Sequence, residues 1–310
     1  MKLVVQIPCL NEEKTLPLVL KSIPKNIEGI DSIIVLVIDD GSNDNTLEIA
    51  KKLGVKEFVH HKQRMGLARS FRDGINRSLE LGADIVVNTD GDNQYPQENI
   101  GDLVKPILEG KADIVVADRQ TQTIEHFSFI KKLMQKMGSR AVNFAAGTNL
   151  PDAASGFRAY SRSSILRINV ITTFSYAMET IIQAGNKGIS ITSVPIKTNP
   201  KLRESRLFKS SFEHVIKSGT AISRAYIMYK PYVIFNTLGV SFFILGLIPF
   251  IRFLFFIGDK KPGNHIQSLI VGAVLIISSF LAFSLGVIAD LIRINRVLEE
   301  ETIELIREKL

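Results

Sequence analysis

Residues 85–96 read Ile-Val-Val-Asn-Thr-Asp-Gly-Asp-Asn-Gln-Tyr-Pro, and this segment is the most informative one about the architecture. It begins as a short β-branched apolar run, which is typical of a strand that is covered on both faces. The run gives way to Asp90 and Asp92, which flank Gly91 on a polar turn. A buried strand that ends in carboxylates predicts a ligand site at the carboxyl end of a parallel sheet.

The same arrangement recurs on both sides of this segment. Three more short apolar runs each stop at a polar cluster, and they span Leu3–Ile7, Ile33–Ile38 and Ile114–Val116. Helical patterns lie between the runs, at residues 12–22, 43–53, 66–81 and 97–110. Alternating strands and helices predict a mainly parallel α/β sheet, and its ligand-binding edge would gather the four polar clusters.

The last third of the chain has a different character. The chain is 45% hydrophobic with a mean hydropathy of +0.16, and the excess lies in two uncharged runs, Pro231–Ile251 and Ile266–Ala289. Each run exceeds the roughly 20 apolar residues that a helix needs to cross a bilayer. We therefore expect a transmembrane hairpin rather than two core helices of a soluble protein. The hairpin would also offer a surface for oligomerisation.

The charges around these runs predict an orientation. A hairpin leaves the N-terminal domain and the C-terminal tail on one side of the membrane, and the short loop on the other. Lys and Arg residues near the span ends favour the terminal side by five to two: Lys217, Arg224, Lys230, Arg293 and Arg296 against Lys260 and Lys261. Because such residues collect on the cytoplasmic side, we expect a multi-pass integral membrane protein whose N-terminal domain is cytoplasmic.

These patterns predict four parts of the chain. Residues 1–206 form the α/β domain, residues 207–230 form amphipathic interface helices, residues 231–292 hold the two transmembrane helices, and residues 293–310 form a cytoplasmic tail. The stretch 207–230 alternates apolar and basic residues, which suits the membrane interface. Packing of this stretch against the α/β domain is the alternative.

Composition narrows the partners. The formal net charge is +7, which fits nucleic acid, anionic lipid headgroups or phosphorylated substrates. The basic residues are dispersed, which fits a solvated, mildly basic surface as well as a lipid-facing patch. We expect membrane lipids as partners and no nucleic acid. Cys9 is the only cysteine, so an intramolecular disulfide is excluded.

The acidic turn also predicts a metal site. Asp90 and Asp92 lie one residue apart after a strand, and Gln94 adds a neutral oxygen in the same loop. Carboxylate and amide oxygens suit Mg²⁺ or Mn²⁺, and such ions commonly bind together with a diphosphate. An acidic turn alone is a weak signal, and its place after an apolar strand strengthens it.

Four segments together resemble the signature of family 2 glycosyltransferases. They are residues 8–13 (Pro-Cys-Leu-Asn-Glu-Glu), 37–46 (Val-Ile-Asp-Asp-Gly-Ser-Asn-Asp-Asn-Thr), 90–96 (Asp-Gly-Asp-Asn-Gln-Tyr-Pro) and 152–160 (Asp-Ala-Ala-Ser-Gly-Phe-Arg-Ala-Tyr). They occur in the family's order, and the resemblance spans roughly residues 3–207. The last segment is similar to that of dolichol-phosphate mannose synthases and their bacterial polyprenyl-phosphate relatives.

The resemblance implies a GT-A nucleotide-sugar-binding fold and inversion at the anomeric carbon. It assigns the nucleoside to Pro8, Glu12 and Asp40, and it makes Asp90 a further nucleotide-binding residue. It assigns the metal and the diphosphate to a second set: Asp90, Asp92 and Gln94. Asp92 is thereby one of two catalytic residues.

Asp152 is the other catalytic residue, and its role stays open. A hydroxyl acceptor needs a general base within hydrogen-bond reach, whereas a phosphate acceptor is already ionised and needs none. Asp152 would be a base in the first case and a positioning group in the second.

The resemblance also assigns phosphate-binding residues, which would hold either the acceptor phosphate or the departing diphosphate. They are Arg119, Ser139, Arg203 and Arg206. Arginine suits phosphate because its planar fork donates two hydrogen bonds at once. The chain departs from the pattern at Gln135, where relatives carry an arginine, and at Arg203 and Arg206, which replace a glycine and a lysine.

These features predict a hexosyltransferase that moves one sugar from a nucleotide-sugar to a membrane lipid, and polyprenyl or dolichyl phosphate is the expected acceptor. Two alternatives remain: transfer to a sugar hydroxyl of a lipid-linked glycan, and a non-catalytic nucleotide-binding membrane scaffold. The chain has no tryptophan, so it lacks the Gln-x-x-Arg-Trp motif of processive synthases. Glu179 would either touch the sugar or acceptor, or be a helix carboxylate paired with a neighbour.

Overall fold

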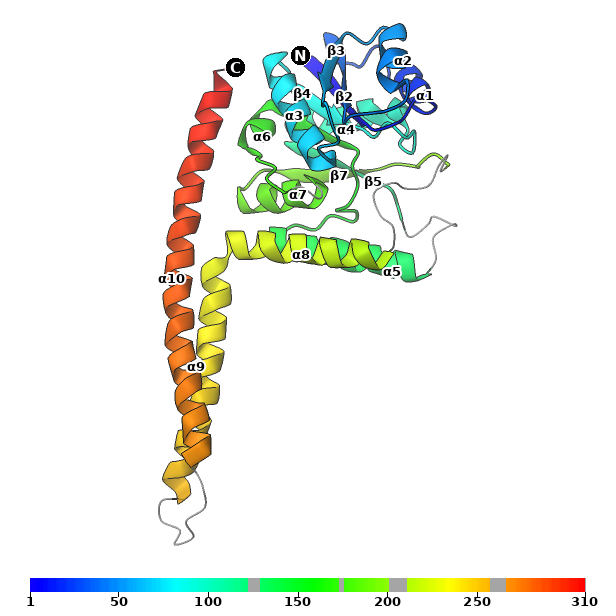
Figure 1. Ribbon diagram of the computed structural model, residues 1–310. Helices are drawn as coiled ribbons and strands as arrows, with labels where there is room; N and C mark the ends of the chain where they lie inside the picture. Colours follow the sequence, from blue (N-terminus) through cyan, green and yellow to red (C-terminus); the bar gives the residue numbers. More distant parts are fainter. Residues whose placement is uncertain (122–128, 173–175, 201–210, 257–265, 310) are drawn as a thin grey trace. The chain divides into compact units, whose positions relative to one another are not determined.

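A computed structural model describes residues 1–121, 129–172, 176–200, 211–256 and 266–309 (Figure 1). The chain divides into two compact units. The first is Met1–Ala225 together with Thr302–Leu310, and the second is Tyr226–Glu301.

A mixed seven-stranded sheet forms the centre of the first unit. Its strands in the described residues are β1 (Lys2–Cys9), β2 (Ser32–Asp39), β3 (Glu57–His60), β4 (Ile85–Asn88), β5 (Ile114–Asp118), β6 (Arg158–Ser161) and β7 (Ile191–Pro195). Their order across the sheet is β3-β2-β1-β4-β6-β5-β7. Only β6 runs antiparallel to its neighbours in this sheet, and it lies between β4 and β5.

Helices connect the strands of the sheet, and in the described residues three further helices follow the last strand. They are α1 (Leu16–Ser22), α2 (Thr46–Lys52), α3 (Leu67–Glu80), the 3-10 turn η1 (Gln97–Asn99), α4 (Ile100–Leu108), α5 (Phe129–Ala146), α6 (Arg162–Arg167), α7 (Tyr176–Asn186), α8 (Ser211–Tyr229), α9 (Pro231–Phe256) and α10 (Ile266–Glu308).

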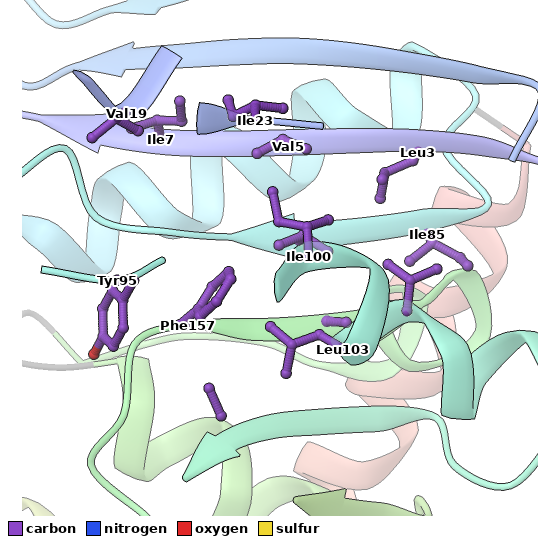
Figure 2. Packing of buried hydrophobic residues seen from close by; sticks show 14 of the residues in the cluster. Leu3, Val5, Ile7, Val19, Ile23, Ile85, Tyr95, Ile100, Leu103 and Phe157 are labelled. Atoms are coloured by element: carbon purple, nitrogen blue, oxygen red, sulfur yellow. The ribbon is translucent and has the colours of Figure 1, made fainter. Parts of the chain in front are cut away.

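The sheet is buried on both faces. On one face Leu3, Val5 and Ile7 of β1 pack against α1 and α4 through Val19 and Leu103 (Figure 2). On the other face, α3 and α7 meet through Phe71 and Tyr176, whose rings stack with centroids 4.1 Å apart. Two covered faces explain why the central strands read as unbroken apolar runs.

The four predicted apolar runs are strands β1, β2, β4 and β5, so the predicted α/β fold is confirmed. β3, β6 and β7 add to it. β3 and β7 are only partly buried edge strands, and β6 opens with the charged residue Arg158, so none of the three has an apolar run. The whole is the GT-A architecture that the resemblance implies.

The second unit contains two helices long and apolar enough to cross a membrane, within Pro231–Phe255 and Ile266–Glu308. Only 11% and 22% of their most apolar windows are buried, whereas a core helix of a soluble protein is mostly buried. The helices approach closely at Gly246 and Gly272, because a Cβ on either glycine would lie about 3 Å from the other's carbonyl oxygen. The pair fits the predicted hairpin of a membrane protein.

Candidate functional site

Sheet topology brings the predicted site residues to one edge. Strands β1, β2, β4 and β5 run parallel, so the segments that follow them meet at their carboxyl ends. β6 runs the opposite way, with Arg158 in register with Asn88 of β4. The segment that leads into β6, residues 152–157, therefore reaches the sheet at this same edge.

The acidic loop after β4 is held by side chains on both sides. Asp92 accepts hydrogen bonds from the backbone N–H of Gln94 at 3.1 Å and from its Nε2 at 2.7 Å. Asn199, beyond β7, donates through Nδ2 to the carbonyl oxygens of Asn93 and Tyr95. The loop is thus fixed before any ligand enters.

Gly156 packs directly against the carboxylate of Asp90. A Cβ at this position would lie 3.3 Å from Asp90 Oδ2 and 3.0 Å from the hydroxyl of Tyr176. The backbone of Gly156 is itself anchored, because its N–H donates to the Tyr95 hydroxyl at 2.9 Å and its carbonyl accepts from Asn88 Nδ2 at 2.9 Å. Asn88 also donates to the Tyr176 hydroxyl at 2.7 Å.

Both tyrosines stay protonated in this environment. Burial, and then the charge of Asp90, raise the pKa of Tyr176 well above its ordinary value. Burial is also the main reason that the pKa of Tyr95 is raised. Neutral hydroxyls can donate and accept at once, so they brace the glycine without adding negative charge beside Asp90.

The residues of the loop fit a divalent cation whose coordination is completed by a diphosphate. Asp90, Asp92 and Gln94 supply oxygens, the ligand type that Mg²⁺ and Mn²⁺ prefer. Within the part of the chain that the structure describes, no group of three or more His, Cys, Asp or Glu side chains has a metal-binding arrangement. One or two carboxylates suffice for Mg²⁺ when phosphates and water complete its coordination.

Asp152 forms a two-point ion pair with Arg119. Arg119 Nε lies 2.6 Å from Asp152 Oδ2, and Nη2 lies 3.0 Å from Oδ1. The backbone N–H of Ala154 also donates to Oδ1, at 3.2 Å. The side chain of Asp152 is only 3% exposed, against 19% for Arg119. The guanidinium thus shields the carboxylate from solvent.

The ion pair keeps both partners charged. Burial alone would raise the pKa of Asp152, but the charge and the hydrogen bonds of Arg119 outweigh it and lower this pKa. Burial likewise opposes the charge on Arg119, yet Tyr95 and Asp152 raise the pKa of the guanidinium. A carboxylate whose pKa is lowered in this way is a weak proton acceptor.

Helix α5 contributes polar atoms beside this ion pair. Ser139 is buried, and its hydroxyl accepts a hydrogen bond from the backbone N–H of Ala153 at 3.2 Å. Gln135, one turn earlier, buries an Oε1 atom that has no hydrogen-bond partner among the described residues. Asn143 instead holds the turn before Asp152, since its Nδ2 donates to the carbonyl oxygen of Leu150.

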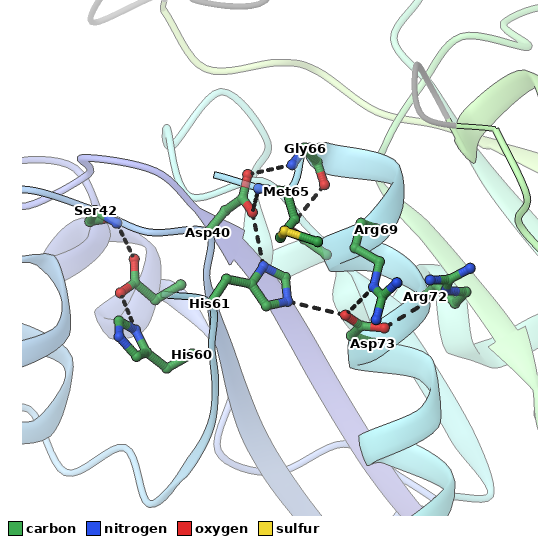
Figure 3. Close-up of polar contacts among 11 residues, drawn as sticks. Asp40, Ser42, His60, His61, Met65, Gly66, Arg69, Arg72 and Asp73 are labelled. Carbon is green, nitrogen blue, oxygen red and sulfur yellow. Dashed lines mark hydrogen bonds and ion pairs between the residues drawn. The ribbon is translucent and has the colours of Figure 1, made fainter. Parts of the chain in front are cut away.

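The residues predicted to face the nucleoside lie at the ends of β1 and β2. Pro8 pairs with Ile38 in the sheet. Glu12 is buried, and its carboxylate accepts a hydrogen bond from the Thr15 hydroxyl at 2.6 Å. Asp40 accepts from the backbone N–H groups of the loop before α3 and contacts a histidine (Figure 3).

Arg158 was not singled out from the sequence, although it belongs to the quoted segment 152–160. It is fully buried and donates to the carbonyl oxygens of Ser155, Ala177 and Ala153 and to the Thr180 hydroxyl. It thereby ties the segment that contains Gly156 to helix α7. The sequence did not indicate that Arg158 is buried, because a charged residue that follows a buried apolar one at the start of a strand usually faces solvent.

Glu179 has a structural role in the described residues. Its carboxylate accepts hydrogen bonds from the backbone N–H groups of Ile171 and Thr172 and from the Thr172 hydroxyl. These contacts favour the second of the two readings, a carboxylate engaged by its own neighbourhood. Arg203 and Arg206 lie outside the described residues.

Comparisons with known proteins agree with this geometry. The chain is 30% identical over 218 residues to a UDP-N-acetylglucosamine–dolichyl-phosphate N-acetylglucosaminyltransferase of Methanococcus voltae, which covers 62% of this chain and 83% of the relative. It is 25% identical over 201 residues to a polyprenol monophosphomannose synthase of Mycolicibacterium smegmatis, which covers 61% of this chain and 74% of the relative.

A solved structure shares the fold. Glucosyl-3-phosphoglycerate synthase from Mycobacterium tuberculosis, in complex with Mn²⁺, UDP and glucosyl-3-phosphoglycerate, has a TM-score of 0.55 and 21% identity, over 73% of this chain and 78% of that one. The family model of glycosyl transferase family 2 matches residues 4–168, which is just over half of the chain and includes β2, β4, β5 and all of β1 from Val4 onward. The chain is therefore a member of the family 2 glycosyltransferases.

Proposed function

We propose that this protein transfers one hexose from a nucleotide-sugar to a polyprenyl or dolichyl phosphate in a membrane. The observation that carries the proposal is the pairing, at one sheet edge, of an acidic loop with a buried arginine–carboxylate pair. The relatives named above support it, because the name of the first gives dolichyl phosphate as acceptor and the name of the second gives a polyprenol monophosphomannose as product.

On the donor side, Pro8, Glu12 and Asp40 would contact the nucleoside. Asp90, Asp92 and Gln94 would hold Mg²⁺ or Mn²⁺ together with the diphosphate. When bound, the cation neutralises the charge that develops on the leaving nucleoside diphosphate. The loop that carries these residues is fixed by Asn199 and by the backbone of Gly156, which lowers the ordering that binding requires.

On the acceptor side, Arg119 and Ser139 would contact the phosphate. Arg119 uses two N–H groups on Asp152, and a guanidinium has five, so others remain for a phosphate oxygen. In the transfer, an acceptor phosphate oxygen attacks the anomeric carbon, and the bond from that carbon to the nucleoside diphosphate breaks, with inversion. Arg203 and Arg206 are proposed to bind the same phosphate or the departing diphosphate.

Asp152 would position Arg119 rather than remove a proton. Its pKa is lowered and both its oxygens are engaged by Arg119. An ionised phosphate needs no base, whereas a sugar hydroxyl needs one. This observation favours the lipid-phosphate acceptor over the sugar hydroxyl of a lipid-linked glycan.

Helix α5 supports a lipid acceptor independently. Its exposed face carries three large apolar side chains, Leu133, Met137 and Phe144, together with Lys136 and Arg140. No acidic residue lies in this helix. An apolar and basic helix face suits a lipid surface, and Ser139 lies on the opposite, buried face. With the two apolar helices, it supports a membrane protein, which we propose to be multi-pass, and the excess of Lys and Arg on the terminal side of the hairpin favours a cytoplasmic catalytic domain.

A donor screen tests the proposal. Full-length protein in detergent is incubated with radiolabelled UDP-N-acetylglucosamine, UDP-glucose or GDP-mannose, with undecaprenyl or dolichyl phosphate, and with Mg²⁺, Mn²⁺ or EDTA. We expect a labelled lipid product with one donor, none in EDTA, and none with the unphosphorylated polyprenol. A product with polyprenol alone would contradict the phosphate acceptor. No turnover of any donor would favour the scaffold.

A matched pair of variants distinguishes a loss of catalysis from a loss of folded protein. Asp92→Asn removes a carboxylate from the acidic loop, whereas Asp102→Asn removes an exposed one from α4. Only the first should abolish the lipid product.

A further inference from the structure

His61 lies between two carboxylates at the edge of the proposed nucleoside site. Its Nδ1 is 2.9 Å from Asp40 Oδ1, and its Nε2 is 3.1 Å from Asp73 Oδ2 (Figure 3). The side chain is 9% exposed, and that of Asp40 is 7% exposed. The imidazole therefore bridges the end of β2 to helix α3 almost out of contact with water.

The two contacts define the protonation state that suits this position. An ionised carboxylate only accepts hydrogen bonds, and a neutral imidazole has one N–H and one acceptor nitrogen. Both contacts are favourable only when both ring nitrogens carry a proton, which makes the ring an imidazolium. In the neutral ring, one nitrogen lone pair would face a carboxylate oxygen.

The charges that face His61 come from two elements. Asp40 follows β2, and Asp73 lies on α3, where it also accepts from Arg69 Nε at 2.7 Å and has Arg72 Nε at 3.7 Å. The adjacent His60 turns away and contacts Asp39, and its side chain is 51% exposed. With a proton on each ring nitrogen, His61 would extend a chain of alternating charges from Arg69 through Asp73 to Asp40.

The contacts of His61 with Asp40 and Asp73, which we call the clamp, also hold the loop before α3, residues 62–66. Asp40 accepts from the backbone N–H of Met65 at 2.7 Å and from that of Gly66 at 2.9 Å. This loop also packs on Gly41, because a Cβ at Gly41 would lie 2.8 Å from the carbonyl carbon of Gln63. Release of His61 from Asp40 would thus loosen both the loop and the carboxylate.

We propose that His61 is a positioning residue whose doubly protonated ring orients Asp40 and the loop at residues 62–66, so that the donor nucleotide binds more weakly once the ring loses a proton. The proposal rests on the proposed function, in which Asp40 contacts the nucleoside. It names a residue that sets the pH dependence of donor binding without touching the reacting atoms.

Nucleotide titration of the full-length protein in detergent tests it. UDP and GDP are titrated with Mn²⁺, and the tighter one is used throughout. His61→Gln should weaken binding about tenfold near pH 6, or about 1.4 kcal/mol, and the ratio of variant to wild-type Kd should fall towards one near pH 9. Because the ratio is compared, titration of the nucleotide and of the metal cancels. His60→Gln is the matched control and should behave as wild type.

Asp73→Asn provides a second test if His61→Gln fails to fold. The asparagine amide can donate to a neutral imidazole at Nε2, so one ring proton then suffices for both contacts. At low pH this variant should bind the nucleotide as tightly as the wild type does, and it should keep that affinity at high pH. A Kd ratio for His61→Gln that is near one at every pH, or equally large at every pH, overturns the proposal. So does an Asp73→Asn variant that keeps the wild-type pH profile. If the wild type binds neither nucleotide, the donor site itself is refuted, and the clamp with it.

Discussion

Substitution of Gly156 by alanine should slow catalysis while leaving the protein folded. The φ angle of Gly156 lies outside the left-handed region, so an alanine backbone fits, and only the added methyl matters. That methyl would lie 3.0 Å from the Tyr176 hydroxyl and 3.3 Å from Asp90 Oδ2. Both distances are shorter than ordinary contacts, so one neighbour must move by a few tenths of an ångström.

The hydrogen bonds indicate which neighbour moves. The Tyr176 hydroxyl is fixed by Asn88 at 2.7 Å, and its ring stacks on Phe71. The carboxylate of Asp90 can shift by rotation of its own side chain, whereas the Tyr176 hydroxyl moves only with its ring, so Asp90 is the easier group to displace. A misplaced ligand of this kind reduces turnover by roughly 10- to 100-fold, or about 1.4 to 2.7 kcal/mol. The overpacking itself should reduce stability by only about 1–2 kcal/mol.

The assay is kcat/KM for lipid product formation as a function of Mn²⁺ concentration, with thermal unfolding in parallel. We expect Gly156→Ala to need more Mn²⁺ and to turn over more slowly even at saturation. Gly101→Ala on α4 is the matched control, because its methyl would meet only Ile27, at 4.0 Å. Wild-type metal activation in Gly156→Ala would show that the contact with Asp90 does not matter to the reaction.

Three further outcomes are expected. Asp92→Asn should lose at least about 100-fold in kcat with an unchanged melting temperature, and wild-type rates at saturating metal would contradict its assignment. Because the pKa of Asp152 is lowered by Arg119, the stability from this carboxylate should be constant above about pH 5 and decline as the pH falls below about 4; the gap in melting temperature between wild type and Asp152→Asn should narrow as the pH falls below that value, and a gap that stays constant from pH 7 to pH 3 would count against the ion pair. After Cys9 is replaced, a cysteine placed in the loop at residues 258–265 should react only from the non-cytoplasmic face of oriented vesicles, and labelling from the cytoplasmic face would invert the topology.

The strands were predictable because their signal is local. The runs that became β1, β2, β4 and β5 are apolar for a reason that acts on each strand separately, namely burial on both faces. β6 escaped prediction because its burial depends on distant partners. Arg158 is buried only since carbonyl groups and a hydroxyl from α7 and from its own loop accept its N–H groups.

The sequence predicted which residues belong to the site, but not which of them contact one another. Asp90, Asp92, Arg119 and Asp152 could be chosen from strand ends and from the resemblance. The ion pair of Arg119 with Asp152 joins residues 33 positions apart, and no local pattern encodes it. Asp40 shows the same limit, because its partner His61 directly follows β3, a strand that the apolar pattern did not predict.

The contacts of Asp152 with Arg119 and of Gly156 with Asp90 connect the acceptor side and the donor side of the site through one rigid segment. Residues 152–158 begin with the carboxylate that holds Arg119, pass Gly156 against Asp90, and end in buried Arg158. Helices α5 and α7 anchor this segment through Ser139 and Thr180. In the proposed reaction the acceptor phosphate and the donor diphosphate both bear negative charge, and they must approach one another without being free to shift. A single braced segment that carries a group for each fixes that separation before either substrate binds, which is where preorganised charge gains most of its effect.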